Sequence, residues 1–217
     1  MAKNVSEKNL LQNYGVLFYN VVKDTELSRE LEEYGYDAAE VANGKALYDN
    51  LVQLYDDNVK ETAEEITAYK KFTNLFDALI NTYTTDRKKA KIIFKEKPEV
   101  LTNLKIKGIQ PRRNAVVLDS IKIFYQTIQN NTDLLQPLQR LKITTTHVQN
   151  QLDQLQAVER AYADYIQEKG ESQQATKNKD LAFKTLEKWI REFYAIAKIA
   201  LEDKPQLLEG VAKLVRS

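Results

Sequence analysis

The stretch that decides the fold is Ala90-Lys-Ile-Ile-Phe-Lys-Glu-Lys-Pro-Glu-Val-Leu101, which returns as Ala197-Lys-Ile-Ala-Leu-Glu-Asp-Lys-Pro-Gln-Leu-Leu208. The two stretches lie 107 positions apart, and each places Lys-Pro after an apolar helical pattern. Extended without a gap, the same offset aligns residues 5–110 with residues 112–217, and 20 of the 106 pairs are identical. An internal match of this length predicts two tandem repeats of one helical unit.

Each repeat begins with an amphipathic pattern. Apolar residues recur at three- and four-residue spacing over residues 10–21 and again over residues 117–128, which predicts one helix in each place. A short helix is expected to follow, capped by Thr25 in the first repeat and by Thr132 in the second. Pro137 conflicts with a regular helix, so the second short helix is expected to be kinked or to start later.

A long helical segment follows, with Asp37 or Thr144 as its expected cap and Pro98 or Pro205 at the start of a brief closing helix. It is either one helix of nearly 60 residues or a hairpin of two. The polar stretches 56–65 and 167–180 favour the hairpin, which is the preferred expectation. An unbroken seven-residue spacing, typical of a coiled coil, favours the single helix: Val41, Tyr48, Tyr55, Thr62, Tyr69, Phe76, Tyr83 and Ala90.

These patterns predict an all-α protein, an up-and-down helical bundle of two tandem repeats of about 107 residues. Hydrophobic residues make up 43% and charged residues 29% of the 217 residues, with six Gly and four Pro, which is a folded, helix-rich composition. The repeats are expected at residues 1–107 and 108–217. They are expected to form one compact or elongated bundle rather than independent domains.

Two further motifs are Gly35-Tyr-Asp37 followed by Gly44-Lys-Ala-Leu47, and the stretch 197–208 quoted above. With these motifs the chain resembles uncharacterised bacterial proteins built of two tandem helical repeats, and the resemblance covers most of the chain. It implies the duplicated fold but carries over no activity and no functional residue. The second repeat departs from the first motif, because Lys142-Ile-Thr144 replaces Gly-Tyr-Asp and Gln151 replaces Gly44.

Composition excludes most catalytic sites. The chain has no Cys and one His, so thiolate chemistry and His-rich metal sites are excluded, and neither a metal nor a cofactor is expected. The single histidine, His147, is expected in the first turn of a helix rather than in catalysis. Neither a Gly-x-Ser-x-Gly motif nor a glycine-rich phosphate-binding motif occurs, and the protein is expected not to be an enzyme.

The net charge of +1 conceals a strong asymmetry. Residues 24–65 hold 13 acidic and three basic residues, whereas residues 87–113 hold ten basic and two acidic residues. The basic segment is a candidate anion-binding site for nucleic acid or a membrane surface. The favoured alternative is internal neutralisation, because a hairpin would bring residues 87–97 back beside residues 37–47. The candidate anion-binding residues are Arg87, Lys88, Lys89, Lys91, Lys95, Lys97, Lys105, Lys107, Arg112 and Arg113.

Three functions follow from the sequence. The favoured one is a non-enzymatic helical scaffold or protein-interaction module, whose partner is a protein, either a second copy or another chain. The second is anion binding through residues 87–113, with nucleic acid the less expected partner. The third is an apolar ligand held between helices beside the heptad tyrosines. Without a signal peptide, a membrane-spanning segment or cysteines, the expected location is the cytoplasm.

Overall fold

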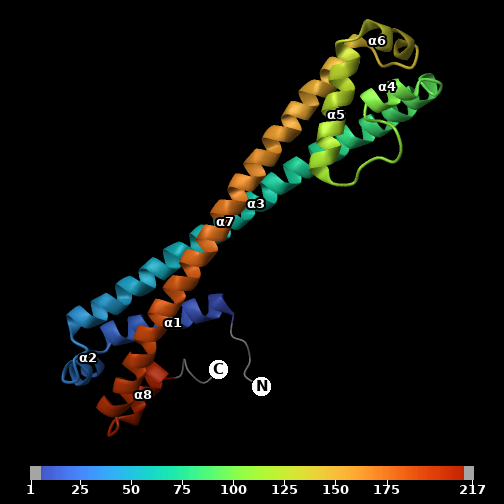
Figure 1. The fold of residues 1–217 in the computed structure, drawn as a ribbon. Helices are drawn as coiled ribbons and strands as arrows, with labels where there is room; N and C mark the ends of the chain where they lie inside the picture. The colour runs from blue at the N-terminus through green and yellow to red at the C-terminus, as the bar shows by residue number, and fades with distance from the viewer. Residues whose placement is uncertain (1–5, 213–217) are drawn as a thin grey trace. The chain divides into compact units, whose positions relative to one another are not determined.

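The computed structural model describes residues 6–212, and these form helices and connecting loops without a strand. The all-α prediction is therefore confirmed. The helices are α1 (Glu7–Lys23), α2 (Thr25–Glu32), α3 (Ala38–Ile93), α4 (Pro98–Asn103), α5 (Asn114–Gln129), α6 (Thr132–Gln139), α7 (Thr145–Ala200) and α8 (Pro205–Ala212). Figure 1 shows their order along the chain.

The hairpin prediction is wrong, because α3 and α7 are each one continuous helix of 56 residues. Gly170, which belongs to the polar stretch 167–180 that favoured the hairpin, lies inside α7. One glycine costs a helix only about 1 kcal/mol relative to alanine, and the Gln, Glu, Lys and Ala residues around it are good helix formers. The two helices also pair in antiparallel fashion, as the contacts Asn58–Thr176 and Lys71–Asp164 show.

The chain divides into two compact units. Unit 1 comprises Met1–Thr62 and Gly170–Ser217, and unit 2 comprises Ala63–Lys169. Each unit therefore combines one end of α3 with one end of α7, and its boundaries differ from the repeat boundaries at residues 107 and 108. The predicted neutralisation between residues 87–97 and residues 37–47 required the hairpin, and it is wrong because these segments lie at opposite ends of the single helix α3.

Each unit has its own hydrophobic core. In unit 1, α1, α2 and α8 pack on the first part of α3 and the last part of α7 (Figure 1), around fully buried side chains such as Leu17 and Leu186. In unit 2, α4, α5 and α6 pack on the last part of α3 and the first part of α7, around Leu79 and Phe124. The helices thus bury the apolar faces that their spacing predicted.

Some of the helix ends lie where the sequence predicts them, and others are displaced by one residue. Asp37 and Thr144 accept backbone N–H groups at the starts of α3 and α7 as predicted, and Pro98 and Pro205 open α4 and α8. The caps of α2 and α6 are Asp24 and Asn131, one residue before the predicted Thr25 and Thr132. Both helices start at matching positions, so the delayed start expected from Pro137 is wrong.

Candidate functional site

Two of the predicted anion-binding residues hold a loop of unit 2. Arg87 is 8% exposed, and its guanidinium donates hydrogen bonds to the carbonyl oxygens of Ile106 (3.0 Å) and Gly108 (2.7 Å). Lys91 donates to the same Gly108 oxygen at 2.6 Å, and burial together with the nearby Arg87 charge lowers its pKa. These two cations fix the loop between α4 and α5, so their charges serve the fold.

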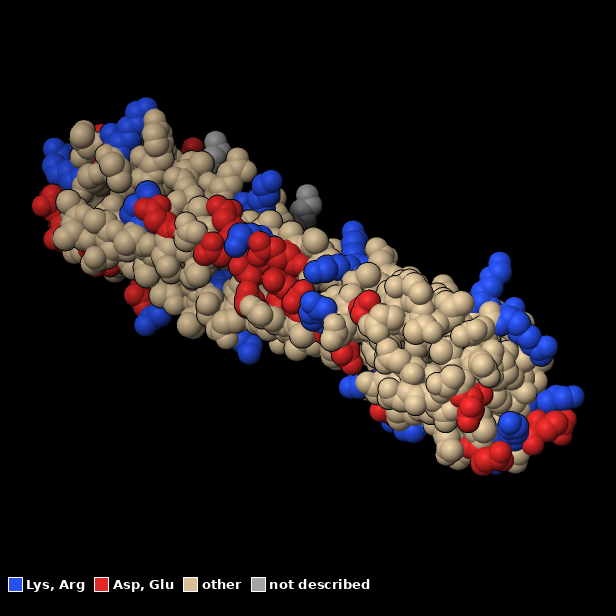
Figure 2. All heavy atoms as spheres, turned by 90° about the horizontal axis from the view of Figure 1, so that it is seen from above, with Lys and Arg blue, Asp and Glu red and all other residues tan. Residues whose placement is uncertain are grey.

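The other eight predicted residues divide into two groups. Three are paired with carboxylates: Lys89 with Asp86, Lys95 with Glu96, and Lys105 with Asp119. Five are exposed and form no ion pair within residues 6–212: Lys88, Lys97, Lys107, Arg112 and Arg113. On the face drawn in Figure 2, Lys and Arg side chains occur as separate groups rather than as one continuous basic surface. The ten residues therefore do not act together as one exposed patch.

The single histidine contacts a buried carboxylate in unit 2. Asp86 is 1% exposed, and its Oδ2 lies 2.5 Å from Nε2 of His147 and 2.9 Å from the hydroxyl of Tyr125, which donates to it. Lys89 donates to the other carboxylate oxygen at 3.1 Å. Burial, with the Asp86 charge in addition, raises the pKa of Tyr125. The carboxylate is thus satisfied by three donors, as a buried charge must be.

Among residues 6–212, no serine hydroxyl is hydrogen-bonded to the Asp86–His147 pair. Ser120, the buried serine of α5, donates its hydroxyl to the carbonyl oxygen of Val116 at 2.8 Å. His147 itself lies in the first turn of α7, where its N–H donates to the cap Thr144, as predicted. The pair Asp86–His147 therefore links α3 to α7 inside unit 2, and its geometry supports a structural role.

Unit 1 contains a cluster of aromatic residues around Trp189. The indole ring lies 5.5 Å from Phe18, 5.6 Å from Tyr36 and 5.2 Å from Phe193, with the Phe193 ring nearly parallel to it. Its Nε1 donates to the carboxylate of Glu40 at 2.6 Å. The Glu40 carboxylate, one turn into α3, thus holds the indole of α7 in place.

The heptad tyrosines pack against other side chains. The ring of Tyr48 lies 5.6 Å from that of Phe18, Tyr83 is fully buried against Phe124 and Tyr125, and the 49% exposed Tyr69 contacts Tyr165. Such edge and tilted contacts are ordinary aromatic packing.

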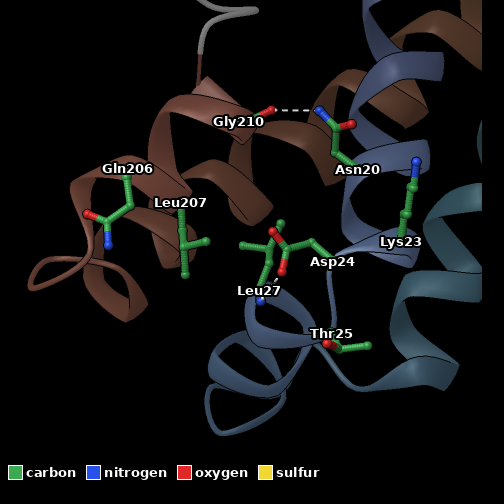
Figure 3. Close-up of a pocket in the computed structure, with 8 residues that line it drawn as sticks. All are labelled: Asn20, Lys23, Asp24, Thr25, Leu27, Gln206, Leu207 and Gly210. Atoms are coloured by element: carbon green, nitrogen blue, oxygen red, sulfur yellow. Dashed lines mark hydrogen bonds between the residues drawn. The ribbon is translucent and has the colours of Figure 1, made fainter.

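One cavity of unit 1, of about 560 Å³, lies between α8 and the junction of α1 with α2 (Figure 3). Asn20 spans it by donating to the carbonyl oxygen of Gly210 at 3.0 Å, and the Asp24 carboxylate caps α2 at the other side. Leu27 and Leu207 extend toward each other from the two walls (Figure 3). Two polar groups of this cavity, the Asn20 amide and the Asp24 carboxylate, already have structural partners. We therefore interpret the cavity as a gap between packed helices.

A second hollow of unit 1 has a different character, and we call it the apolar groove. It has a volume of about 380 Å³ and lies where α1, α2 and the start of α3 meet. Its lining is mainly apolar with two carboxylates among the polar residues: Val21, Val22, Ser28, Glu32, Tyr36, Asp37, Ala38, Val41, Ala42 and Lys45. Val22 is 68% exposed, and the exposed Val16 and Tyr19 precede it on α1. The apolar surface therefore continues out of the groove along one helix.

The groove has a rigid floor and an acidic rim. The ring of Tyr36 is held edge-on by Trp189 and Phe193, and burial raises the pKa of its hydroxyl, with Glu192 and Glu40 adding to the effect. Glu32 and Asp37 stand exposed at the rim, whereas the single lining cation, Lys45, is paired with Asp49. The groove therefore offers apolar contact beside uncompensated negative charge.

Sequence reasoning missed the apolar groove. Val22, Ala38 and Ala42 belong to the exposed sides of α1 and α3, and the apolar periodicity used to find the core assigns them to solvent. Gly35 and Tyr36 were recognised as part of a motif but given no role, and Asp37 was predicted only as a helix cap. In the structure Gly35 has a positive φ of 88°, which lets the chain turn from α2 into α3 and places Tyr36 on the groove floor.

Comparisons with protein-family models, with curated proteins and with solved structures gave no match. The resemblance to duplicated bacterial helical proteins therefore stays a prediction, and function has to be argued from the geometry of the chain. No helix within residues 6–212 combines the length and the apolar character that crossing a membrane requires.

Proposed function

We propose that this chain is a non-enzymatic helical interaction module, and that the apolar groove of unit 1 is its docking site. The occupant is a protein segment that presents an aliphatic side chain flanked by Lys or Arg. The observation that carries the proposal is the conjunction of an apolar floor with an acidic rim in one hollow of about 380 Å³.

The apolar part of the groove supplies the driving force for binding. Val22, Ala38 and Ala42 are exposed, so an aliphatic side chain placed between them removes apolar surface of both partners from water. Full burial of one aliphatic side chain contributes about 1.5–3 kcal/mol. Because Tyr36 is fixed by the aromatic cluster, little conformational freedom is lost on binding.

The rim supplies selectivity for a basic partner. Within unit 1, 19 Asp and Glu stand against 15 Lys and Arg, a net charge of −4. Two cations of unit 1 are already paired: Lys204 with Glu26 at 2.7 Å and with Glu30 at 3.0 Å, and the lining Lys45 with Asp49. Glu32 stays available at the rim, and Asp37 keeps its negative charge there while one of its oxygens caps α3. Such charges steer a complementary partner and reject an acidic one.

We also propose that the chain arose as a tandem duplication. Helices α5, α6, α7 and α8 each begin 107 residues after α1, α2, α3 and α4, which supports the repeat seen in the sequence. The groove motif is not shared: Lys142, Ile143 and Thr144 occupy the places of Gly35, Tyr36 and Asp37. One repeat thus carries the docking site while the other keeps the architecture.

The test uses a defined peptide and methyl-detected NMR of the intact chain. The probe is acetyl-Lys-Lys-Ile-Lys-Lys-amide, and the matched control replaces each Lys by Glu. The basic probe should shift the methyl signals of Val22, Val41 and Ala42, the acidic one should not, and Ala42→Lys should abolish the shifts. If the basic probe leaves these signals unchanged at millimolar concentration, the proposed docking site is wrong.

A small apolar ligand is a second candidate for the same groove. Its volume falls at the lower end of the range of about 300–1,000 Å³ that is usual for small-molecule pockets. A neutral apolar probe that binds as tightly as the basic peptide, independently of salt, would favour this candidate over a protein segment.

A further inference from the structure

Unit 2 presents an exposed isoleucine on a fixed loop. Ile109 lies between α4 and α5 and is 93% exposed, whereas Ile106, three residues earlier, is fully buried. Almost all of the aliphatic surface of Ile109 is therefore available to a partner.

The loop that carries Ile109 is held in place from both sides. Arg87 and Lys91 donate to the carbonyl oxygen of Gly108, and the hydroxyl of Thr84 donates to the side-chain oxygen of Gln110 at 3.1 Å. Gly108 has a positive φ of 74°, which sets the direction in which the chain leaves this anchor. The backbone of the loop is therefore anchored at Gly108, and the side chain of Gln110 is hydrogen-bonded to Thr84. Ile109 lies between these two anchors.

The residues beside Ile109 are basic. Lys107, Arg112 and Arg113 are exposed, and none of them forms an ion pair with another described residue of the chain. Unit 2 as a whole has 17 Lys and Arg against 12 Asp and Glu, a net charge of +5. An exposed aliphatic side chain with basic flanks is the occupant whose chemistry the apolar groove fits.

We infer that the partner of the apolar groove is a second copy of this chain, whose Ile109 enters the groove while its Lys107, Arg112 and Arg113 face Glu32 and Asp37 of the first copy. This inference rests on the proposed function of the groove. Ile109, the knob of this contact, and the apolar groove lie in different units, with net charges of +5 and −4, so the contact joins surfaces of opposite charge. Such a contact has one small apolar centre and a charged periphery, so the association is concentration-dependent and weakens with salt.

The experiment measures the mass of the full chain by sedimentation velocity over a concentration series at low and at high salt. Wild type should exceed the monomer mass of 25.1 kDa as concentration rises, with less association at high salt. Ile109→Glu and Val22→Lys change side chains that are 93% and 68% exposed, so both variants should fold, which their thermal unfolding checks. Each should weaken self-association about tenfold or more.

Mixing the two variants is the decisive arm. The Ile109→Glu chain keeps an intact groove, and the Val22→Lys chain keeps an intact Ile109. In an equimolar mixture one contact can therefore form between the two kinds of chain, and the complex should be limited to two chains. Leu181→Glu, which changes another side chain that is 66% exposed, is the matched control and should associate like wild type.

The inference is overturned if wild type stays monomeric at every concentration, or if neither variant changes the association. Peptide binding to the groove by a monomeric chain would leave the proposed function standing and refute only the second copy as its partner. Binding of wild type, but not of Ile109→Glu, to anionic phosphatidylserine vesicles without any self-association would likewise overturn the inference and assign the loop to a membrane surface.

Discussion

Replacing Gly44 by alanine tests the packing of α3 against Trp189, and Gly170→Ala provides a control with the opposite sign. Both glycines lie inside the long helices. At Gly170 an added Cβ meets no atom within 4 Å, so the variant should gain the full helix propensity of alanine, about 1 kcal/mol.

At Gly44 the same methyl group would lie 2.4 Å from Cζ2 of Trp189, whereas ordinary van der Waals contact begins at 3.4 Å. The indole would have to retreat by the difference, but Phe18 and Phe193 flank it at ring distances of 5.5 and 5.2 Å. Overpacking of this kind costs about 1–3 kcal/mol. A displaced ring also loses the 2.6 Å hydrogen bond to Glu40, which contributes about 1.5 kcal/mol or more.

After the gain in helix propensity, Gly44→Ala should destabilise the chain by about 1.5–3.5 kcal/mol, and it should differ from Gly170→Ala by about 2.5–4.5 kcal/mol. The assay is urea unfolding followed by far-UV circular dichroism and by the fluorescence of Trp189, the only tryptophan and a residue of unit 1. The emission of native Gly44→Ala should also shift. Equal stability of the two variants, with unchanged emission, would refute the packing argument.

Three further predictions concern single side chains. Tyr125→Phe removes a donor from a buried carboxylate and should cost about 1.5–3 kcal/mol in urea unfolding. Lys142 has a positive φ of 66°, so Lys142→Gly should raise the unfolding free energy by about 1 kcal/mol. The hydrogen bond from Lys204, and then that from Arg29, lower the pKa of Glu30. The resulting stabilisation is present above the ordinary carboxyl pKa and is lost as the pH falls through the lowered value, so Lys204→Met should flatten the loss of thermal stability in acid, whereas Lys97→Met should not.

Much of the fold follows from local signals in the sequence. Proline at the starts of α4 and α8, and Asp37 and Thr144 at the starts of α3 and α7, act within one turn of helix, so spacing alone identifies them. The caps of α2 and α6 were misplaced by one residue because two adjacent side chains compete for the same N–H groups. In the structure the side chains of Asp24 and Asn131 accept these N–H groups, and the threonines that follow them are the first residues of the helices.

Contacts between distant segments were harder to predict. Gly44 and Trp189 differ from Gln151 and Thr82 at the corresponding repeat positions, and a small residue facing a large one is a recognisable exchange of volume. This exchange of volume could be recognised only once the start of α3 was known to pack on the end of α7. The same applies to Asp86 and His147, whose pairing needs α3 and α7 as single antiparallel helices.

The division of the chain into units sets an order of folding during synthesis. Unit 2 is a contiguous segment, Ala63–Lys169, so all the side chains of its core are synthesised before any part of Gly170–Ser217. Unit 1 must wait, because Leu186, Ile190 and Phe193 supply one wall of its core. Until then the apolar faces of α1 and α2 lack the part of the core that α7 supplies. Unit 1, although it contains α1 and α2, therefore completes its core after unit 2.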